Sequence, residues 1–214
     1  TDGAYDITVA PLVDAWGYGP SGHKVDTPTD EQIRRLLAAV GWRKLHVNVE
    51  FLSLQKDVPE LQIDLGSVLQ GYAIDRLSEL LTSAGVQEFL IDVGGELRCR
   101  GTWNVAIDQP DSSSSTREFV LKDAALATTG TYRISPDGRP ETRHVISPRT
   151  GAPVESPNLL CAVKGANGRD ADAWATALFC LPTADALQLA ERHGLSVLLI
   201  DAQGMATGSG ELTP

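Results

Sequence analysis

The sequence predicts an α+β fold in which packed helices cover a mixed or largely antiparallel sheet. Strand-like and helix-like segments follow one another irregularly, without the strict strand–helix–strand repeat that a parallel sheet requires. The chain has 214 residues, of which 42% are hydrophobic and 21% are charged, so it can bury a proper core. It contains no run of apolar residues long enough to span a membrane. These features indicate a globular chain.

Capping and turn residues place the elements of the first half of the chain. A helix is expected after Thr29, because Thr29 and Gln32 have the spacing of a capping box and an apolar stripe follows them. Two strands, 46–54 and 61–65, are expected across a charged turn. The clearest helix is 67–85, where leucine and alanine recur at helical spacing.

The second half of the chain combines a series of short strands with two helices. One helix contains Asp172, and another is expected at 184–193. The expected strands are 87–93, 96–101, 103–108, 117–123, 125–129 and 158–165, with a terminal hairpin of 195–201 and 205–210.

Charge and cysteine usage exclude some classes of function. The formal net charge of -10 argues against sequence-independent binding to nucleic acid or to an anionic membrane. Cys99, Cys161 and Cys180 are far apart and include no CxxC pair, so buried small side chains are expected and not a zinc cluster or a redox pair. The chain opens with TDGAYDIT, without Met, so we expect a processed or truncated start.

The segment RDADAWATALFCL carries an acid and a hydroxyl in an otherwise apolar helix. Asp172 and Thr176 are four residues apart, so they lie on one face, one turn from each other. Both provide the hard oxygen donors that Mg²⁺ prefers. The same spacing also fits an acid near a helix N-terminus and a Thr that bonds back along its own helix. Two oxygens are too few for a metal site, so a backbone carbonyl, water or substrate phosphates must complete it.

Glycine-containing turns provide further candidates. The segment DLGSVLQG, with Ser67, lies between a strand and a helix, where backbone groups either approach a phosphate or simply form a turn. The segment DVGGEL places Gly94 and Gly95 in a strand-like run, which indicates either a bulge or a platform for a flat ligand.

Hydroxyl, basic and aromatic side chains provide the remaining candidates. The segment ATTGTYR, with Thr129 and Gly130, suits phosphate hydrogen bonds but also any turn. In RHVISPRTG, His144 and Arg149 would handle a proton and a phosphate charge, although a lone surface histidine is the default interpretation of His144. Tyr5 and its aromatic neighbours near the start either stack a planar ring or pack in a core.

The order of these motifs resembles that of the ApbE family of FAD:protein FMN transferases. GAYDITVAPLVDAWGYG, DLGSVLQGYAIDR, DVGGEL, ATTGTYR, HVISPRTG and ADAWATALF follow one another along nearly the whole chain. The resemblance implies an ApbE-like, T-fold-like architecture in which residues 1–214 form a single transferase domain without the N-terminal portion of the family. It also implies a periplasmic or envelope-associated protein, attached to a membrane only through a lipid anchor that this chain does not contain.

The resemblance also implies an activity and a set of site residues. Family members transfer FMN from FAD to a Thr or Ser hydroxyl of a flavoprotein, with Mg²⁺, and release AMP. The metal ligands would be Asp172, Thr176 and the carbonyl of Ser67, and the catalytic residues would be His144 and Asp172. The expected FAD-contacting residues are Tyr5, Asp6, Ser67, Gln70, Gly94, Gly95, Thr129, Gly130, His144, Arg149 and Thr150.

Three positions depart from the family's usual motifs. DLGGIAKG is replaced by DLGSVLQG, so Ser67 stands at a position of a small residue and Gln70 at that of a lysine. DPRTG is replaced by SPRTG, so Ser147 stands at the position of an acid. The changes either compensate each other or indicate a divergent member, with weaker transfer or with FAD binding alone. A pyrophosphatase that splits FAD into FMN and AMP is the alternative enzyme, and a non-catalytic FAD-binding protein is the alternative outside enzymes.

Overall fold

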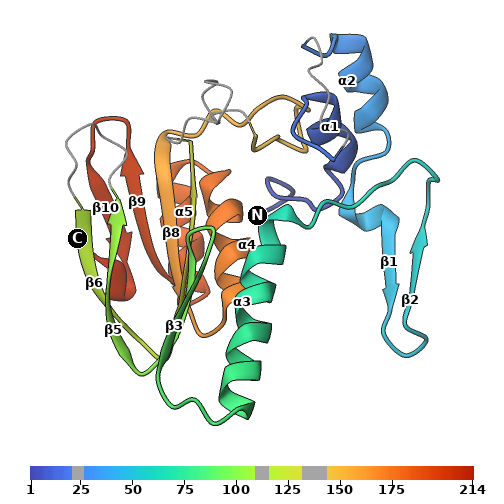
Figure 1. The fold of residues 1–214 in the computed structure, drawn as a ribbon. Helices are drawn as coiled ribbons and strands as arrows, with labels where there is room; N and C mark the ends of the chain where they lie inside the picture. Colours follow the sequence, from blue (N-terminus) through green and yellow to red (C-terminus); the bar gives the residue numbers. More distant parts are fainter. Residues whose placement is uncertain (21–26, 109–115, 132–143) are drawn as a thin grey trace. The chain divides into compact units, whose positions relative to one another are not determined.

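The computed structural model describes residues 1–20, 27–108, 116–131 and 144–214, which belong to two compact units (Figure 1). Unit 1 comprises Thr1–Leu65 and Arg143–Glu155, and unit 2 comprises Gly66–Thr142 and Ser156–Pro214. The single domain expected over 1–214 stays a prediction. Within the described residues, no helix has both the length and the apolar character needed to cross a membrane.

Unit 2 is built on a six-stranded sheet with the strand order β10-β9-β8-β7-β4-β3. Every neighbouring pair in this sheet is antiparallel, which confirms the expected α+β class with an antiparallel sheet. The strands are β3 (Phe89–Val93), β4 (Glu96–Arg100), β7 (Ala125–Gly130), β8 (Asn158–Gly165), β9 (Ser196–Asp201) and β10 (Ala206–Ser209), and η3 (Gly210–Leu212) follows the last.

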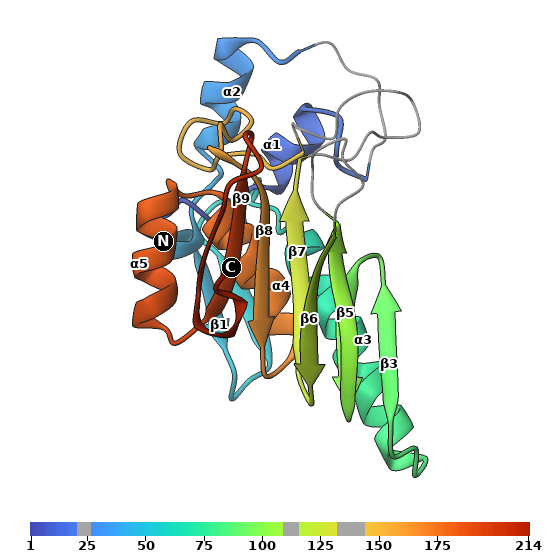
Figure 2. The ribbon, with the colours of Figure 1, turned by 90° about the vertical axis from the view of Figure 1, so that its left-hand side faces the viewer.

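A hairpin covers one face of this sheet, and helices cover the other (Figure 2). The hairpin consists of β5 (Thr102–Asp108) and β6 (Thr116–Lys122). Its apolar side chains pack with Leu160 and Ala162 of β8 in one buried cluster. Since side chains alternate along a strand, Cys161 of β8 faces the helical side. The two faces of the sheet are therefore buried against different layers.

Three helices form the helical layer, close to where the sequence predicts helices: α3 (Gly66–Ser83), α4 (Gly168–Phe179) and α5 (Thr183–Arg192). Helix α4 packs on β7, β8 and α3. Helices α3 and α4 approach most closely at two glycines. A Cβ atom built on Gly168 would lie only 2.6 Å from the carbonyl oxygen of Gly71. The absence of side chains at both positions allows the two backbones to meet.

Unit 1 contains α1 (Ala10–Ala15), α2 (Asp30–Leu37), η1 (Trp42–Lys44) and the antiparallel hairpin β1 (Leu45–Asn48) and β2 (Ser53–Lys56). The predicted capping box is confirmed, because the side chains of Thr29 and Gln32 each accept from the other's backbone N–H.

Two predictions for unit 1 are wrong. The strand expected at 46–54 is interrupted, because its middle forms the turn of the β1–β2 hairpin. The strand expected at 61–65 is absent, and Gln62 makes only an isolated bridge to Val9. Apolar alternation alone does not distinguish a strand from an extended segment that lacks a partner strand.

Candidate functional site

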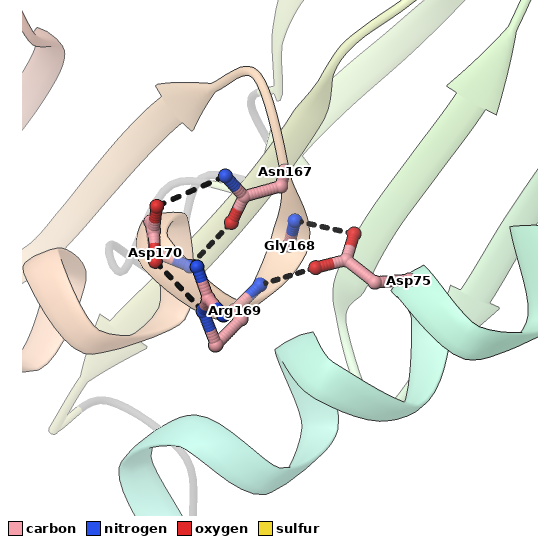
Figure 3. A network of polar contacts seen from close by, with 5 residues as sticks. All are labelled: Asp75, Asn167, Gly168, Arg169 and Asp170. Atoms are coloured by element: carbon pink, nitrogen blue, oxygen red, sulfur yellow. Dashed lines mark hydrogen bonds and ion pairs between the residues drawn. The ribbon is translucent and has the colours of Figure 1, made fainter. Parts of the chain in front are cut away.

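The N-terminus of α4 is held by side chains from its own first turn and from α3 (Figure 3). Asn167 is the N-cap residue, and its Oδ1 accepts a hydrogen bond from the N–H of Asp170 at 2.8 Å. The carboxylate of Asp75, on α3, accepts from the N–H of Gly168 at 2.7 Å and from the N–H of Arg169 at 2.9 Å. These contacts satisfy three N–H groups that have no partner within a helix. The first turn of α4 is thereby fixed against α3.

Asp172 lies one turn further along α4, and it is buried. Asp172 is only 4% exposed, and its Oδ2 accepts a hydrogen bond from the N–H of Gly71 at 2.9 Å. Burial raises the pKa of Asp172 above its usual range, and the Gly71 hydrogen bond offsets part of this rise. Among the described residues, no basic side chain forms an ion pair with Asp172. A buried carboxylate without a basic partner suits a place where a cation binds.

Thr176 follows Asp172 on the same helix, at the expected spacing of one turn. Its hydroxyl lies 3.0 Å from the hydroxyl of Thr129, on β7. Thr129 is buried, with 8% exposure. The structure therefore brings three of the predicted residues together in unit 2.

Ser67 and Gln70 lie in the first turns of α3. Gln70 is next to the turn between β3 and β4. The side-chain amide of Gln70 lies so close to Gly94 that a Cβ atom there would overlap with it. Gly94 and Gly95 have φ values of 72° and 108°, which favour glycine, and the N–H of Gly95 donates to Asp92 Oδ1 at 3.1 Å. The tight turn accounts for both glycines, and their contact with FAD stays a prediction.

Gly130 ends β7, next to Thr129, and its contact with FAD stays a prediction. The other predicted residues lie in unit 1. Arg149 Nη2 donates to the carbonyl oxygens of Thr1, at 3.2 Å, and Asp2, at 2.7 Å. The hydroxyl of Ser147 accepts from the N–H groups of Arg149 and Thr150, both at 3.3 Å. A serine hydroxyl thus caps this turn as a carboxylate also would, so the departure at Ser147 leaves the turn intact.

Asp6 is also buried in unit 1, where its carboxylate joins two backbone segments. Its Oδ1 accepts from the N–H and hydroxyl of Thr8, and its Oδ2 accepts from the N–H of Trp42 at 2.8 Å. The backbone N–H of Tyr5 donates to Thr1 Oγ1 at 3.3 Å. The contacts of Asp6 explain its burial through the fold of unit 1, and the roles of Tyr5 and Asp6 toward FAD stay predictions.

His144 lies beside an aromatic ring of the same unit. The ring centroids of His144 and Tyr18 are 6.5 Å apart, in an edge-to-face arrangement. Both residues belong to motifs that the sequence singles out, although their contact could not be predicted from sequence. The catalytic role of His144 stays a prediction.

Sequence reasoning missed Gly71 and Asp75, which hold the first turns of α4. They lie four residues apart on α3, so both belong to the face that contacts α4. Their spacing is visible in the segment QGYAID, but an aspartate in the middle of a helix has no evident partner until α4 is placed beside it.

The side-chain oxygens of Asp172 and Thr176 provide only some of the ligands that a magnesium ion needs. No group of three or more His, Cys, Asp or Glu side chains that could hold a metal occurs among the described residues. Mg²⁺ typically binds one or two carboxylates together with waters and substrate phosphates. Asp172 and Thr176, with the α3 turn next to them, therefore fit an ion that a diphosphate helps to hold.

Comparisons with known proteins match most of the chain. The model of the ApbE family matches residues 1–199. A FAD:protein FMN transferase of Escherichia coli (strain K12) is 38% identical over 216 residues, and its counterpart from Vibrio cholerae is 33% identical over 210 residues. These matches cover 95% and 94% of this chain.

Solved structures agree with the sequence comparison. The flavin transferase ApbE from Vibrio cholerae superimposes with a TM-score of 0.87 at 31% identity, covering 99% of this chain and 70% of that one. The apo flavinyl transferase ApbE from Pseudomonas stutzeri gives 0.85 at 32% identity, covering 98% of this chain and 68% of that one. The chain spans 61% and 62% of the two curated relatives. On these grounds, the chain belongs to the ApbE family.

Proposed function

We propose that the protein transfers FMN from FAD to a Thr or Ser hydroxyl of a target flavoprotein, in a Mg²⁺-dependent reaction that releases AMP. The relatives that carry the name FAD:protein FMN transferase support the reaction. The observation that carries it in this chain is the buried carboxylate of Asp172, which lies beside Thr176 and has no basic partner among the described residues. The acceptor oxygen attacks the FMN phosphorus, and the bond between the two phosphates breaks.

The residues of unit 2 provide oxygen ligands and hold them in position. When bound, Mg²⁺ supplies neutralisation of the charge that develops on the diphosphate. Asp172 provides the anionic ligand, and the Gly71 N–H holds its second oxygen. If the hydroxyl of Thr176 donates its proton to Thr129, its lone pairs stay available for the cation. We propose the carbonyl of Ser67 as the third protein ligand.

His144 is our candidate for accepting the proton that leaves the acceptor hydroxyl. A neutral imidazole accepts a proton near neutral pH. The resemblance of HVISPRTG to the family motif supports this role. We expect His144→Ala to slow AMP release much more than it weakens FAD binding, and an equal loss of both would argue against proton transfer.

The partners and the cellular location of the protein follow from the same proposal. Its partners would be FAD and an acceptor flavoprotein with a Thr or Ser attachment site. We propose a periplasmic or envelope location, where a lipid anchor on another part of the protein would provide the attachment to a membrane.

The test of the proposal uses an isosteric substitution and a matched control on the same helix. Purified protein is incubated with FAD, Mg²⁺ and a candidate acceptor peptide, and AMP, FMN and the peptide mass are measured. Asp172→Asn removes the buried charge but keeps the shape of the side chain. Asp170→Asn removes an exposed carboxylate two residues earlier, which pairs with Arg169.

We expect AMP and a flavinylated peptide from the wild-type protein and from Asp170→Asn, and neither from Asp172→Asn. AMP with free FMN, and no modified peptide, would instead indicate a pyrophosphatase. Intact FAD that stays bound would indicate a non-catalytic binding protein. Normal turnover by Asp172→Asn would refute the assignment of the metal ligand.

A further inference from the structure

Helices α3 and α4 are joined by reciprocal contacts between carboxylates and backbone N–H groups. Asp75, on α3, accepts from the N–H groups of Gly168 and Arg169 on α4. Asp172, on α4, accepts from the N–H of Gly71 on α3. Each helix thus contributes one carboxylate, which accepts hydrogen bonds from backbone N–H groups of the other helix. The contacts lie one helical turn apart on both helices, because Gly71 precedes Asp75 by four residues and Gly168 precedes Asp172 by four.

We propose that Asp75 is a positioning residue for the candidate cation site. This inference rests on the proposed function, because it concerns the same carboxylate. Asp75 fixes the first turn of α4 against α3, and Asp172 lies in the next turn. Asp75 therefore determines how the Asp172 carboxylate is presented beside the turn of α3 that contains Ser67.

The environment of Asp75 holds its carboxylate in a fixed position. Its side chain is 18% exposed, and both of its oxygens accept backbone hydrogen bonds of normal length (Figure 3). The free N–H groups of a helix N-terminus favour a negative charge there. The Nε of Arg98, on β4, lies 3.7 Å from Asp75 Oδ1 and adds a positive charge. Hydrogen bonds to a carboxylate are stronger than those between neutral groups.

The backbones of α3 and α4 are in direct contact where the two glycines meet. A Cβ on Gly71 would lie 2.7 Å from the Cβ of Asp172, so the α3 backbone already touches the side chain that it positions. If the bonds to Asp75 are lost, the first turn of α4 is held only by its own cap, and the distance between Asp172 and α3 becomes variable. Metal sites lose roughly 10- to 100-fold in affinity when a residue that orients a ligand is removed.

Asn167 provides a matched control for an alternative explanation, in which Asp75 merely caps α4. The Asn167 side chain caps the same helix end by accepting from the N–H of Asp170, but it makes no hydrogen bond to α3. Asn167→Ala therefore removes a cap without releasing α4 from α3. Asp75→Ala removes both functions, and Asp75→Asn keeps one acceptor oxygen of the same size.

The experiment measures metal binding directly, without turnover. Each variant of the full chain is titrated with Mn²⁺, alone and with ADP as a diphosphate that carries no FMN to transfer. Free Mn²⁺ is followed by electron paramagnetic resonance, against a blank of ADP without protein. We expect a dissociation constant about tenfold higher for Asp75→Ala, an intermediate value for Asp75→Asn, and the wild-type value for Asn167→Ala. In the FAD assay, the Mg²⁺ concentration for half-maximal AMP release should rise in the same order. Circular dichroism checks that each variant is folded. If Asp75→Ala does not fold, the Mn²⁺ affinity of Asp75→Asn decides the test.

Equal Mn²⁺ affinity in Asp75→Asn, Asp75→Ala and the wild-type protein would overturn the inference. Equal weakening by Asn167→Ala would also overturn it, because capping alone would then explain the effect. If wild-type protein binds Mn²⁺ and the predicted order holds, but no AMP is released, the proposed function fails while the inference stands. If wild-type protein binds no Mn²⁺ either alone or with ADP, both fail.

Discussion

Replacing Gly71 by alanine tests the contact that brings α3 and α4 together. A Cβ at this position would lie 2.5 Å from the carbonyl carbon of Gly168 and 2.7 Å from the Cβ of Asp172. Both distances are shorter than real Cβ atoms show, and the first neighbour is backbone, which moves only with its helix. Gly71→Ala must therefore push α4 away from α3 and lengthen the hydrogen bond from the Gly71 N–H to Asp172.

The magnitude follows from three opposing contributions. Overpacking of a tight contact destabilises by about 1–3 kcal/mol. Loss of a hydrogen bond to a charged group removes about 1.5–3 kcal/mol. Alanine has a better helix propensity than glycine, which returns about 1 kcal/mol. We therefore expect Gly71→Ala to lower the free energy of unfolding by about 1.5–5 kcal/mol.

Urea denaturation followed by circular dichroism measures this change, with Ser83→Ala as the control. Ser83 is the exposed last residue of α3, so its substitution should change the free energy of unfolding by less than about 0.5 kcal/mol. Hydrogen exchange of the peptide 168–179 reports on α4 itself. If Gly71→Ala unfolds at the same urea concentration as the control and α4 exchanges at the wild-type rate, the close helix contact is refuted.

Three further predictions concern other parts of the protein. Thr129→Val removes the hydroxyl contact with Thr176 of α4 and should lower the rate of AMP release about 3- to 10-fold. Thr129→Ser keeps the hydroxyl and should keep the wild-type rate. Equal rates in the two variants would refute the role of this contact. Burial raises the pKa of the Cys180 thiol to about 12 and that of Cys161 well above its usual range, so almost no thiolate exists at pH 8. Ellman's reagent should therefore label both residues much faster in urea than in the native protein, and rapid native labelling, located by mass spectrometry, would contradict this. Gly151→Ala should destabilise unit 1 by about 1–3 kcal/mol in urea denaturation, because its Cβ would overlap with core side chains. Gly3→Ala, which has a similar positive φ but open space around it, is the control that isolates the overlap, and equal loss in both variants would leave only backbone strain.

Periodicity was sufficient to predict the helices of unit 2, because their apolar faces are long and regular. Helices α3 and α4 and the strand β8 lie close to where the pattern predicts them. It was not sufficient at 61–65, because a short apolar run becomes a strand only if another strand is placed beside it. Helix α1, of six residues, is too short to show a helical period.

In the candidate site too, the sequence predicts the spacing along one helix but not the partners from other elements. The spacing of Asp172 and Thr176 along one helix predicts that they share a face, since this depends only on the 3.6-residue turn. Their partners come from other elements: Gly71 from α3 and Thr129 from β7.

By itself, the sequence determined the α+β class, the helices of unit 2 and the shared face of the two oxygen donors, because each depends on local periodicity. Only the tertiary structure decided that Asp172 is buried without a basic partner among the described residues, and that Asp75 fixes the helix that carries it. The physical reason is that burial and hydrogen-bond partners depend on which distant segments pack together. The role of Gly71 and Gly168, which allow α3 and α4 to touch, is visible only when both helices are placed side by side.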